Sequence, residues 1–173
     1  IVMFHPVTTE INEMKQYVEN FVISLLEDNH NYIVIFPNND LGSQFILEAY
    51  EKLKDNVRFR IFPSLRFEYF LTLLKNSQFI IGNSSAGIRE APYYGIPIIN
   101  IGTRQQNRAV HADIINTDYS KNGITKALSI IDAHKLKSVK DDFGQGNSNE
   151  LFLQCLQKTD IWQLNHQKQF RDI

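Results

Sequence analysis

The sequence predicts an α/β fold: a Rossmann-like parallel sheet with helices on both faces. Short apolar runs, expected as strands, alternate along the chain with longer amphipathic segments, expected as helices. This alternation is the pattern of βαβ units, which build a parallel sheet between two helix layers. No internal repeat or low-complexity tract interrupts it.

Each element is assigned from its apolar spacing and from the residues that bound it. In the first helix, apolar residues from Ile11 to Leu25 recur at spacings of three and four, and Thr9 is a plausible N-cap. Pro37, Pro63 and Gly102 each follow an apolar run and close a strand. Strands are expected at residues 1–4, 32–36, 57–62, 78–81, 97–101 and 113–116, and helices at residues 10–28, 43–53, 67–74, 85–94, 123–133 and 150–158.

Length and composition limit the possible classes of function. The 173 residues suffice for one domain, and we assign residues 1–173 to a single domain. The net charge of -1 argues against a nucleic-acid surface. No apolar run approaches the roughly 20 residues of a membrane span. Cys155 is the one cysteine, so no internal disulfide can form, and this fits a cytoplasmic protein.

The first residues have none of the features of a signal peptide, because they lack a basic region and Pro6 follows at once. They resemble a strand entered midway. We therefore expect the chain to be a fragment of a longer protein.

Small and polar residues follow the expected strands. In an open parallel sheet, ligands bind at the carboxyl ends of the strands, so the loops there are the first place to look for a site. The residues just past a strand end are His5, Asn38, Ser64, Ser84 and Thr103.

The segment from Gly82 to Gly102 has the features of a phosphate site. A strand ends at Gly82, and small residues lead directly into a helix, whose free N–H groups and positive end favour an anion. The hydroxyls of Ser84 and Ser85 can add hydrogen-bond donors. The alternative is that these two serines only cap the helix.

Two charged residues extend this candidate site. Glu90 lies about one turn into the helix, where its carboxylate could accept hydrogen bonds from both ribose hydroxyls; the alternative is a glutamate favoured by the helix dipole. Arg104 follows the next strand and offers a planar fork to phosphate, although it could equally be an ordinary loop arginine. Arg89 is interpreted as a surface charge.

A serine-hydrolase interpretation competes with the phosphate site. Residues 82–86 (GNSSA) approach the G-x-S-x-G turn that presents a nucleophilic serine, with Ala86 in place of the last glycine. His111, His134 and His166 follow Ser84, but none has a clear acidic partner placed after a strand. The hydrolase interpretation is therefore the weaker one.

Four motifs in order resemble the hydrolysing UDP-N-acetylglucosamine 2-epimerases. Single motifs of this kind are weak signals, whereas four in the expected order are specific. They are residues 4–8 (FHPVT), 36–42 (FPNNDLG), 82–105 (GNSSAGIREA followed by YGIPIINIGTRQ) and 143–147 (FGQGN).

The resemblance implies a two-domain fold of the GT-B type, of which this chain resembles the second half. The implied reaction is anti elimination of UDP to leave 2-acetamidoglucal, followed by hydration to N-acetylmannosamine. A related branch returns UDP and is non-hydrolysing. The serine pair and the Gly-Thr-Arg-Gln run resemble the hydrolysing, sialic-acid-forming branch. No cofactor or metal is implied.

The resemblance also implies roles for individual residues. Ser84, Ser85 and Ala86 would hold the diphosphate, and Glu90 the ribose hydroxyls. His5 would be the catalytic residue that stabilises the departing UDP. Three further residues would complete the UDP site: Phe70 and the backbone at Ser64 and Leu65 around the uracil. Arg104 remains the candidate phosphate contact of the preceding argument.

Some expectations concern parts that this chain lacks. The groups that transfer the C2 proton would belong to the first domain, so the chain alone should not turn over substrate. The family usually has aspartate where this chain has Gln145, which leaves that contact in doubt. The full-length protein would be a homo-oligomer. The open alternatives are the donor-binding half of a GT-B glycosyltransferase, a non-hydrolysing epimerase, and a nucleotide-sugar sensor without activity.

Overall fold

The computed structural model describes residues 1–106, 108, 114–135 and 144–163. Contacts between Cα atoms divide the chain into two compact units, Ile1–Val139 and Lys140–Ile173. The first unit contains the sheet, and the second contains α6 and a short 3₁₀ helix. The assignment of residues 1–173 to one domain stays a prediction.

The first unit contains a six-stranded sheet in which every neighbouring pair of strands is parallel. The spatial order is β3-β2-β1-β4-β5-β6, so the chain builds outward from β1 in one direction and then from β4 in the other. This is the doubly wound order of a Rossmann-like fold, as the sequence predicts. The strands are β1 (Val2–Met3), β2 (Tyr32–Ile35), β3 (Phe59–Phe62), β4 (Ile80–Gly82), β5 (Ile98–Ile101) and β6 (Ile115–Thr117).

Helices connect the strands of the first unit, and two further helices belong to the second unit. The α-helices are α1 (Met14–Glu27), α2 (Ser43–Tyr50), α3 (Phe67–Lys75), α4 (Ala86–Tyr94), α5 (Lys121–Ile131) and α6 (Ser148–Leu156). Three 3₁₀ helices accompany them: η1 (Thr8–Glu10), η2 (Glu51–Leu53) and η3 (Thr159–Gln163).

The sheet separates two hydrophobic cores, because successive residues of a strand point to opposite faces. On β4, Ile81 belongs to the larger core and Ile80 to the smaller one. On β5, Ile99 and Ile98 divide in the same way. Both faces of the sheet are therefore buried at its centre, which explains why β1, β2 and β4 are apolar throughout rather than alternating.

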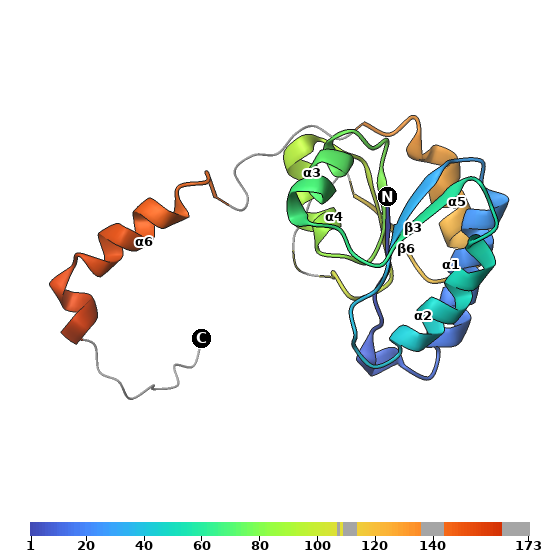
Figure 1. Cartoon of the computed structure of the whole chain (residues 1–173), viewed down its shortest axis with the longest axis horizontal. Helices are drawn as coiled ribbons and strands as arrows, with labels where there is room; N and C mark the ends of the chain where they lie inside the picture. Colours follow the sequence, from blue (N-terminus) through green and yellow to red (C-terminus); the bar gives the residue numbers. More distant parts are fainter. Residues whose placement is uncertain (107, 109–113, 136–143, 164–173) are drawn as a thin grey trace. The chain divides into compact units, whose positions relative to one another are not determined.

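Each face is covered by its own helices, as Figure 1 shows for the sheet-containing unit. Helix α1 contacts both α2 and α5, and the buried apolar residues of these three helices belong to the larger core. Helices α3 and α4 contact each other and supply the smaller core. The predicted α/β architecture with helices on both faces is confirmed.

The first helix begins later than its apolar spacing suggests. Thr8–Glu10 forms a 3₁₀ turn, and α1 starts at Met14 with Glu13 at the N-cap, so the expected N-cap role of Thr9 is wrong. Hydrogen bonds from Glu13 to Glu10 and from Met14 to Ile11 span three residues, as in a 3₁₀ turn rather than an α-helix.

Two strands also begin later in the sequence than predicted. β3 begins at Phe59, because Val57 is 87% exposed and lies outside the sheet. β6 spans Ile115–Thr117, and the predicted start of that strand at residue 113 lies outside the described residues. These shifts do not alter the strand order or the loops that follow the strands.

Helix α6 of the second unit has no buried residue. Leu151, Phe152 and Leu153 on this helix are each more than half exposed. Within the described ranges, no helix has both the length and the hydropathy needed to cross a membrane.

Candidate functional site

The candidate site lies where the strand order reverses. β1 and β4 are neighbours in the sheet but belong to the two halves of the fold. Loops from the carboxyl ends of two such strands diverge to opposite faces and leave a crevice between them. The loop after β1 begins near His5, and the loop after β4 carries Ser84 and Ser85. The reversal of strand order therefore brings two of the sequence-predicted loops together.

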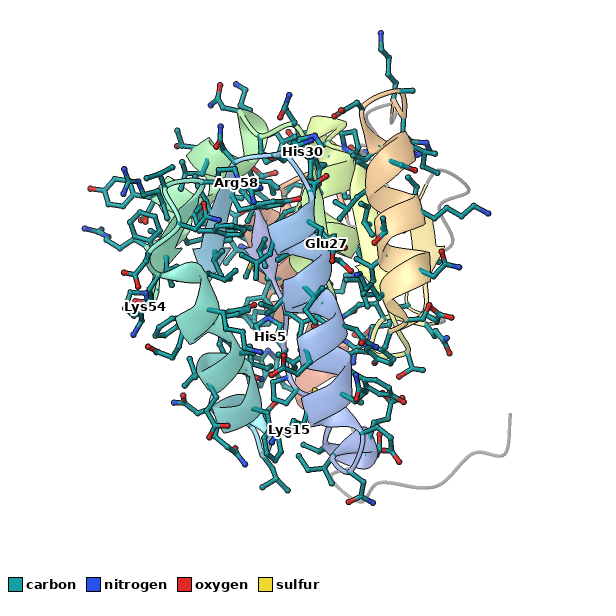
Figure 2. All side chains as sticks on the ribbon, turned by 90° about the vertical axis from the view of Figure 1, so that its right-hand side faces the viewer. His5, Lys15, Glu27, His30, Lys54 and Arg58 are labelled. Carbon is teal, nitrogen blue, oxygen red and sulfur yellow. The ribbon has the colours of Figure 1, made fainter. Side chains whose placement is uncertain are left out.

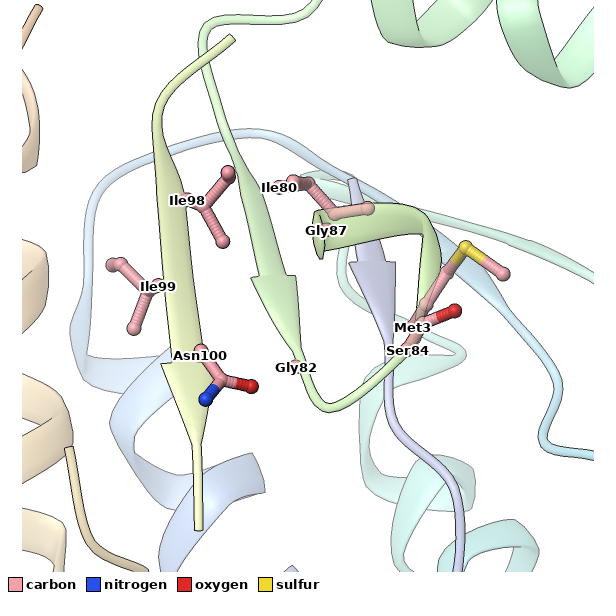
Figure 3. Close-up of a pocket in the computed structure, with 8 residues that line it drawn as sticks. All are labelled: Met3, Ile80, Gly82, Ser84, Gly87, Ile98, Ile99 and Asn100. Atoms are coloured by element: carbon pink, nitrogen blue, oxygen red, sulfur yellow. The ribbon is translucent and has the colours of Figure 1, made fainter. Parts of the chain in front are cut away.

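Gly82 allows the chain to leave β4 directly beside β1. Its φ of 139° is unfavourable for any residue with a side chain, and a Cβ atom there would lie 2.0 Å from the carbonyl oxygen of Met3. Figure 3 shows Gly82 at the end of β4 and Ser84 on the turn that leads into α4. The close approach of the two strands thus fixes where the phosphate-type turn begins.

Gly87 lets the first turn of α4 approach the sheet. A Cβ atom at this position would lie 3.3 Å from a methyl carbon of Ile98 on β5. A small cavity of about 10 Å³ remains between the strands and the turn, as Figure 3 shows, with Gly87 and Asn100 among its lining residues. The first turn of α4 therefore packs against β4 and β5 through Gly87, which faces Ile80 and Ile98.

The two serines differ in their local hydrogen bonds. The Ser84 hydroxyl accepts a hydrogen bond from the Ala86 N–H at 3.3 Å, which is a capping interaction. Ser85 occupies the N-cap position of α4, yet its side chain makes no capping hydrogen bond. Both side chains are partly exposed. The capping alternative thus accounts for Ser84 and leaves the Ser85 hydroxyl available to a ligand.

An open cleft of about 290 Å³ lies in front of this turn. That size is near the lower end of the roughly 300–1,000 Å³ usual for small-molecule sites. One wall is apolar and comes largely from the α3 region, and the other is formed by the first turns of α4. The lining residues are Met3, Ile35, Leu65, Phe67, Phe70, Ser84, Ser85, Ala86 and Glu90.

Six sequence-predicted residues meet in this cleft. Glu90 lies about one turn from the serines along α4, which places a carboxylate beyond the phosphate-type turn. Phe70 is 7% exposed, so most of its ring belongs to the smaller core and only an edge reaches the cleft. The six residues are Leu65, Phe70, Ser84, Ser85, Ala86 and Glu90.

Three predicted residues do not line the cleft. Ser64 is exposed in the loop after β3. Arg104 is partly buried, and its guanidinium donates a hydrogen bond to the carbonyl oxygen of Asn83 at 3.2 Å. His5 is partly buried in the loop after β1. Arg104 therefore contacts the residue that precedes the serine pair, whereas Ser64 lies outside the lining.

Sequence reasoning missed three apolar residues of the cleft. Met3 and Ile35 lie near the carboxyl ends of β1 and β2, where a strand pattern marks them only as core. Phe67 is 60% exposed, and its ring centroid lies 6.5 Å from that of Phe70. The spacing of three residues between these two phenylalanines places them on one helix face, which is a signal that could have identified Phe67.

His5 is held as a neutral imidazole. The backbone N–H of Asn38 donates a hydrogen bond to its Nδ1 atom at 3.1 Å, so Nδ1 has no proton and the neutral ring carries its proton on Nε2. Burial, and to a lesser extent the positive charge of Arg104, lower the pKa of His5 to about 4, although the negative charge of Asp40 acts in the opposite direction. At neutral pH His5 can donate one hydrogen bond from Nε2 without carrying a charge.

The structure gives the serine-hydrolase interpretation no support. His111 and His166 lie outside the described residues. His134 follows α5, and Asp132 at the end of that helix contacts His30, which precedes β2. His134 is therefore near the amino ends of the strands, whereas Ser84 follows the carboxyl end of β4.

The remaining predictions concern metal ligands and the second unit. In the parts of the chain that the structure describes, no group of three or more His, Cys, Asp or Glu residues is arranged to hold a metal ion.

Gln145 is exposed between two glycines of positive φ, Gly144 and Gly146, neither of which has a neighbour within 4 Å of an added Cβ atom.

Comparison with known sequences gives a consistent family. The family model described as UDP-N-acetylglucosamine 2-epimerase matches residues 1–157. The chain is 44% identical over its whole length to a UDP-N-acetylglucosamine 2-epimerase of Neisseria meningitidis, of which it covers 46%. It is 33% identical over 88% of its length to polysialic acid biosynthesis protein P7 of Escherichia coli, covering 38% of that protein.

A further relative is described as hydrolysing. The chain is 29% identical over 90% of its length to a UDP-N,N'-diacetylbacillosamine 2-epimerase (hydrolyzing) of Legionella pneumophila and covers 41% of it. The chain thus spans less than half the length of each of these three relatives.

A solved structure shares the fold. The crystal structure of a UDP-GlcNAc 2-epimerase from Neisseria meningitidis bound to UDP-GlcNAc superposes with a TM-score of 0.69 at 14% identity. The match covers 90% of this chain and 43% of that one. The expectation that the chain folds as one Rossmann-like half of such a protein is confirmed.

Proposed function

The chain belongs to the UDP-N-acetylglucosamine 2-epimerase family, and from this membership we propose that it is the nucleotide-binding half of a UDP-N-acetylglucosamine 2-epimerase. One observation carries the proposal. A single cleft combines an apolar, partly aromatic wall, a carboxylate and a helix amino terminus with a serine pair. These are the three surfaces that a base, a ribose and a diphosphate require.

The base end of the ligand would lie against the apolar wall. Phe70 offers a ring edge and Leu65 an aliphatic side chain, and Phe67 is exposed enough to cover a planar ring. Backbone groups at Ser64 and Leu65 would read the uracil edge. A uracil is uncharged, so an apolar surface with a few backbone hydrogen bonds suits it.

The sugar and phosphates would follow along α4. Glu90 would accept hydrogen bonds from the ribose hydroxyls, and the diphosphate would lie over the turn formed by Ser84, Ser85 and Ala86. The free N–H groups and positive end of the helix favour the phosphate charge. Arg104 would contribute its charge from the neighbouring loop.

His5 would act on the departing UDP. Its neutral imidazole can donate the Nε2 proton as a hydrogen bond to a phosphate oxygen, which stabilises the negative charge that develops as the C1–O bond breaks. Elimination also removes the C2 proton, which requires a base. We assign that base to the half of the protein that this chain lacks.

We propose the hydrolysing outcome, in which water adds to 2-acetamidoglucal and N-acetylmannosamine and UDP are released. The relative described as hydrolyzing and the sequence resemblance in residues 82–105 support it. A role in sialic-acid-type or surface-polysaccharide sugar synthesis, a cytoplasmic location and a homo-oligomeric full-length protein belong to the same proposal.

Calorimetric titration with UDP tests the site through Glu90→Gln. This substitution keeps the size of the side chain and removes its charge. Loss of a charged hydrogen bond should weaken UDP binding by about 1.5–3 kcal/mol, which is roughly ten- to hundredfold in Kd. Glu68→Gln is the matched control, because Glu68 is exposed on α3 and does not line the cleft. Equal affinity of wild type and Glu90→Gln would remove Glu90 from the site.

A further inference from the structure

Asn83 is a fully buried polar residue that directly precedes the serine pair of the candidate site. It has an exposed fraction of 0% and lies between the end of β4 and Ser84. A buried amide is costly unless its donors and acceptors are satisfied. The partners of Asn83 therefore show what this residue holds in place.

The side-chain amide of Asn83 forms two hydrogen bonds with the backbone of His5. The His5 N–H donates to Oδ1 of Asn83 at 2.7 Å, and Nδ2 of Asn83 donates to the His5 carbonyl oxygen at 2.8 Å. A peptide N–H can only donate and a carbonyl can only accept, so the pair fixes the orientation of the amide. This reciprocal contact continues the pairing of β1 and β4 beyond the last residue of either strand.

The backbone of Asn83 is held from a third loop. Its carbonyl oxygen accepts a hydrogen bond from Nε2 of Gln105 at 2.8 Å and a second one from Arg104 at 3.2 Å. Gln105 is itself 2% exposed. Asn83 thus joins the loops that follow β1, β4 and β5, and the next residue in the chain is Ser84.

The His5 ring is fixed separately, from the loop after β2. The Asn38 N–H occupies Nδ1, while the backbone of His5 is fixed by Asn83. The imidazole is thus held at two points, its backbone and its Nδ1 atom. Removal of the Asn83 contact would free the backbone and loosen the Asn38 hydrogen bond with it.

We propose that Asn83 is a positioning residue for His5: its side-chain amide holds the His5 backbone so that Asn38 can keep the imidazole in the Nε2–H form beside the phosphate-binding turn. The role of the Nε2 proton in this proposal rests on the proposed function. Because Asn83 and Ser84 are adjacent, the serine turn and the imidazole are also held in a fixed position relative to each other.

Nitrogen NMR of the histidine rings tests this positioning role. In the wild-type protein, His5 should show a proton on Nε2, none on Nδ1, and a pKa near 4. In Asn83→Ala and Asn83→Asp, the ring should become a mixture of both neutral forms. In Asn83→Ala its pKa should also move toward 6.5 as the ring gains access to water. In Asn83→Asp the new negative charge raises the pKa by itself, so the proton position is the readout for that variant. Asn83→Asp keeps the acceptor for the His5 N–H and loses the donor to its carbonyl.

Asn100→Ala is the matched control. Asn100 is also a buried asparagine at a strand end, 4% exposed, but its side chain donates to Asn116 and not to His5. The control should keep the wild-type ring form and pKa. Identical His5 spectra in Asn83→Ala and Asn100→Ala would overturn the proposal.

The wild-type protein supplies a measurement that does not depend on any variant folding. A His5 ring that carries its proton on Nδ1, or that titrates near 6.5, would also overturn the proposal. These readouts need no ligand, so they can fail while UDP still binds, and the Glu90 titration can fail while His5 remains fixed. Failure of this proposal is therefore distinguishable from failure of the proposed function.

Discussion

At the scale of single residues, the site depends on groups whose sequence signal is weak. The sequence pointed to Ser84, Ser85 and Glu90 because a small-residue turn between a strand and a helix has a known use, and all three line the cleft. Asn83 lies in the same segment, but no local pattern marks it, because its partner His5 is 78 residues away in the sequence. Local spacing cannot identify a contact that exists only once β1 and β4 are neighbours.

Gly82 allows a test at this scale. Gly82→Ala should lower the free energy of unfolding by about 3 kcal/mol or more, because positive φ costs about 1–3 kcal/mol and the new Cβ atom would overlap the backbone of Met3. Gly42→Ala is the comparison, since its φ is 99° but the close neighbour is a terminal side-chain carbon of Ile11, which can move. Urea denaturation measures both, and equal losses would show that the contact with β1 is unimportant.

At the scale of elements, a cluster at the amino ends of the strands joins α1, β2 and α5. The His30 ring contacts Asp28 through Nδ1 at 2.7 Å and Asp132 through Nε2 at 3.0 Å, and Arg58 donates to the His30 carbonyl oxygen. Figure 2 shows His30 and Arg58 near one end of the helices, away from His5. The sequence does not reveal this cluster, because Asp132 and His30 are 102 residues apart.

The cluster predicts a pH-dependent contribution to stability. Burial lowers the pKa of His30, but hydrogen bonds and charge from Asp132 and Asp28 outweigh it, so the pKa lies above 6.5. A raised pKa in the folded state means that the stabilisation is complete below pH 6.5 and disappears as pH rises through the folded value.

Asp132→Asn should lower the His30 pKa and remove part of that stabilisation. Because Asp132 is 67% exposed, water screens the pair and the loss should be about 0.2–1 kcal/mol. Urea denaturation at pH 6 and at pH 8.5 measures it, with a larger difference from wild type expected at pH 6. A loss of the same size at both values would exclude a titrating histidine as its cause.

At the scale of the whole molecule, the fold could be predicted almost completely and the lining of the candidate site only in part. Strand and helix runs predicted the parallel sheet, because a buried parallel sheet imposes apolar strands whatever its ligand. The apolar periodicity of the sequence does not reveal the strand order β3-β2-β1-β4-β5-β6. That order decides which loops meet. It brings the loops of His5 and Ser84 together, whereas the separation of Leu65, which lines the cleft, from its neighbour Ser64, which does not, is a matter of local loop conformation.

The proposed division of labour between two halves has a direct consequence. The chain covers 46% of its Neisseria relative and carries the cleft but, in our proposal, no base for the C2 proton. The chain alone should therefore bind UDP and release none from UDP-N-acetylglucosamine, whereas the full-length protein should release UDP with free N-acetylmannosamine. Chromatography of both reactions measures the products, and UDP titration of the same sample shows that the chain is folded. UDP formed by the chain alone would place the proton transfer on residues of this half, and a UDP-linked product from the full-length protein would exclude the hydrolysing outcome.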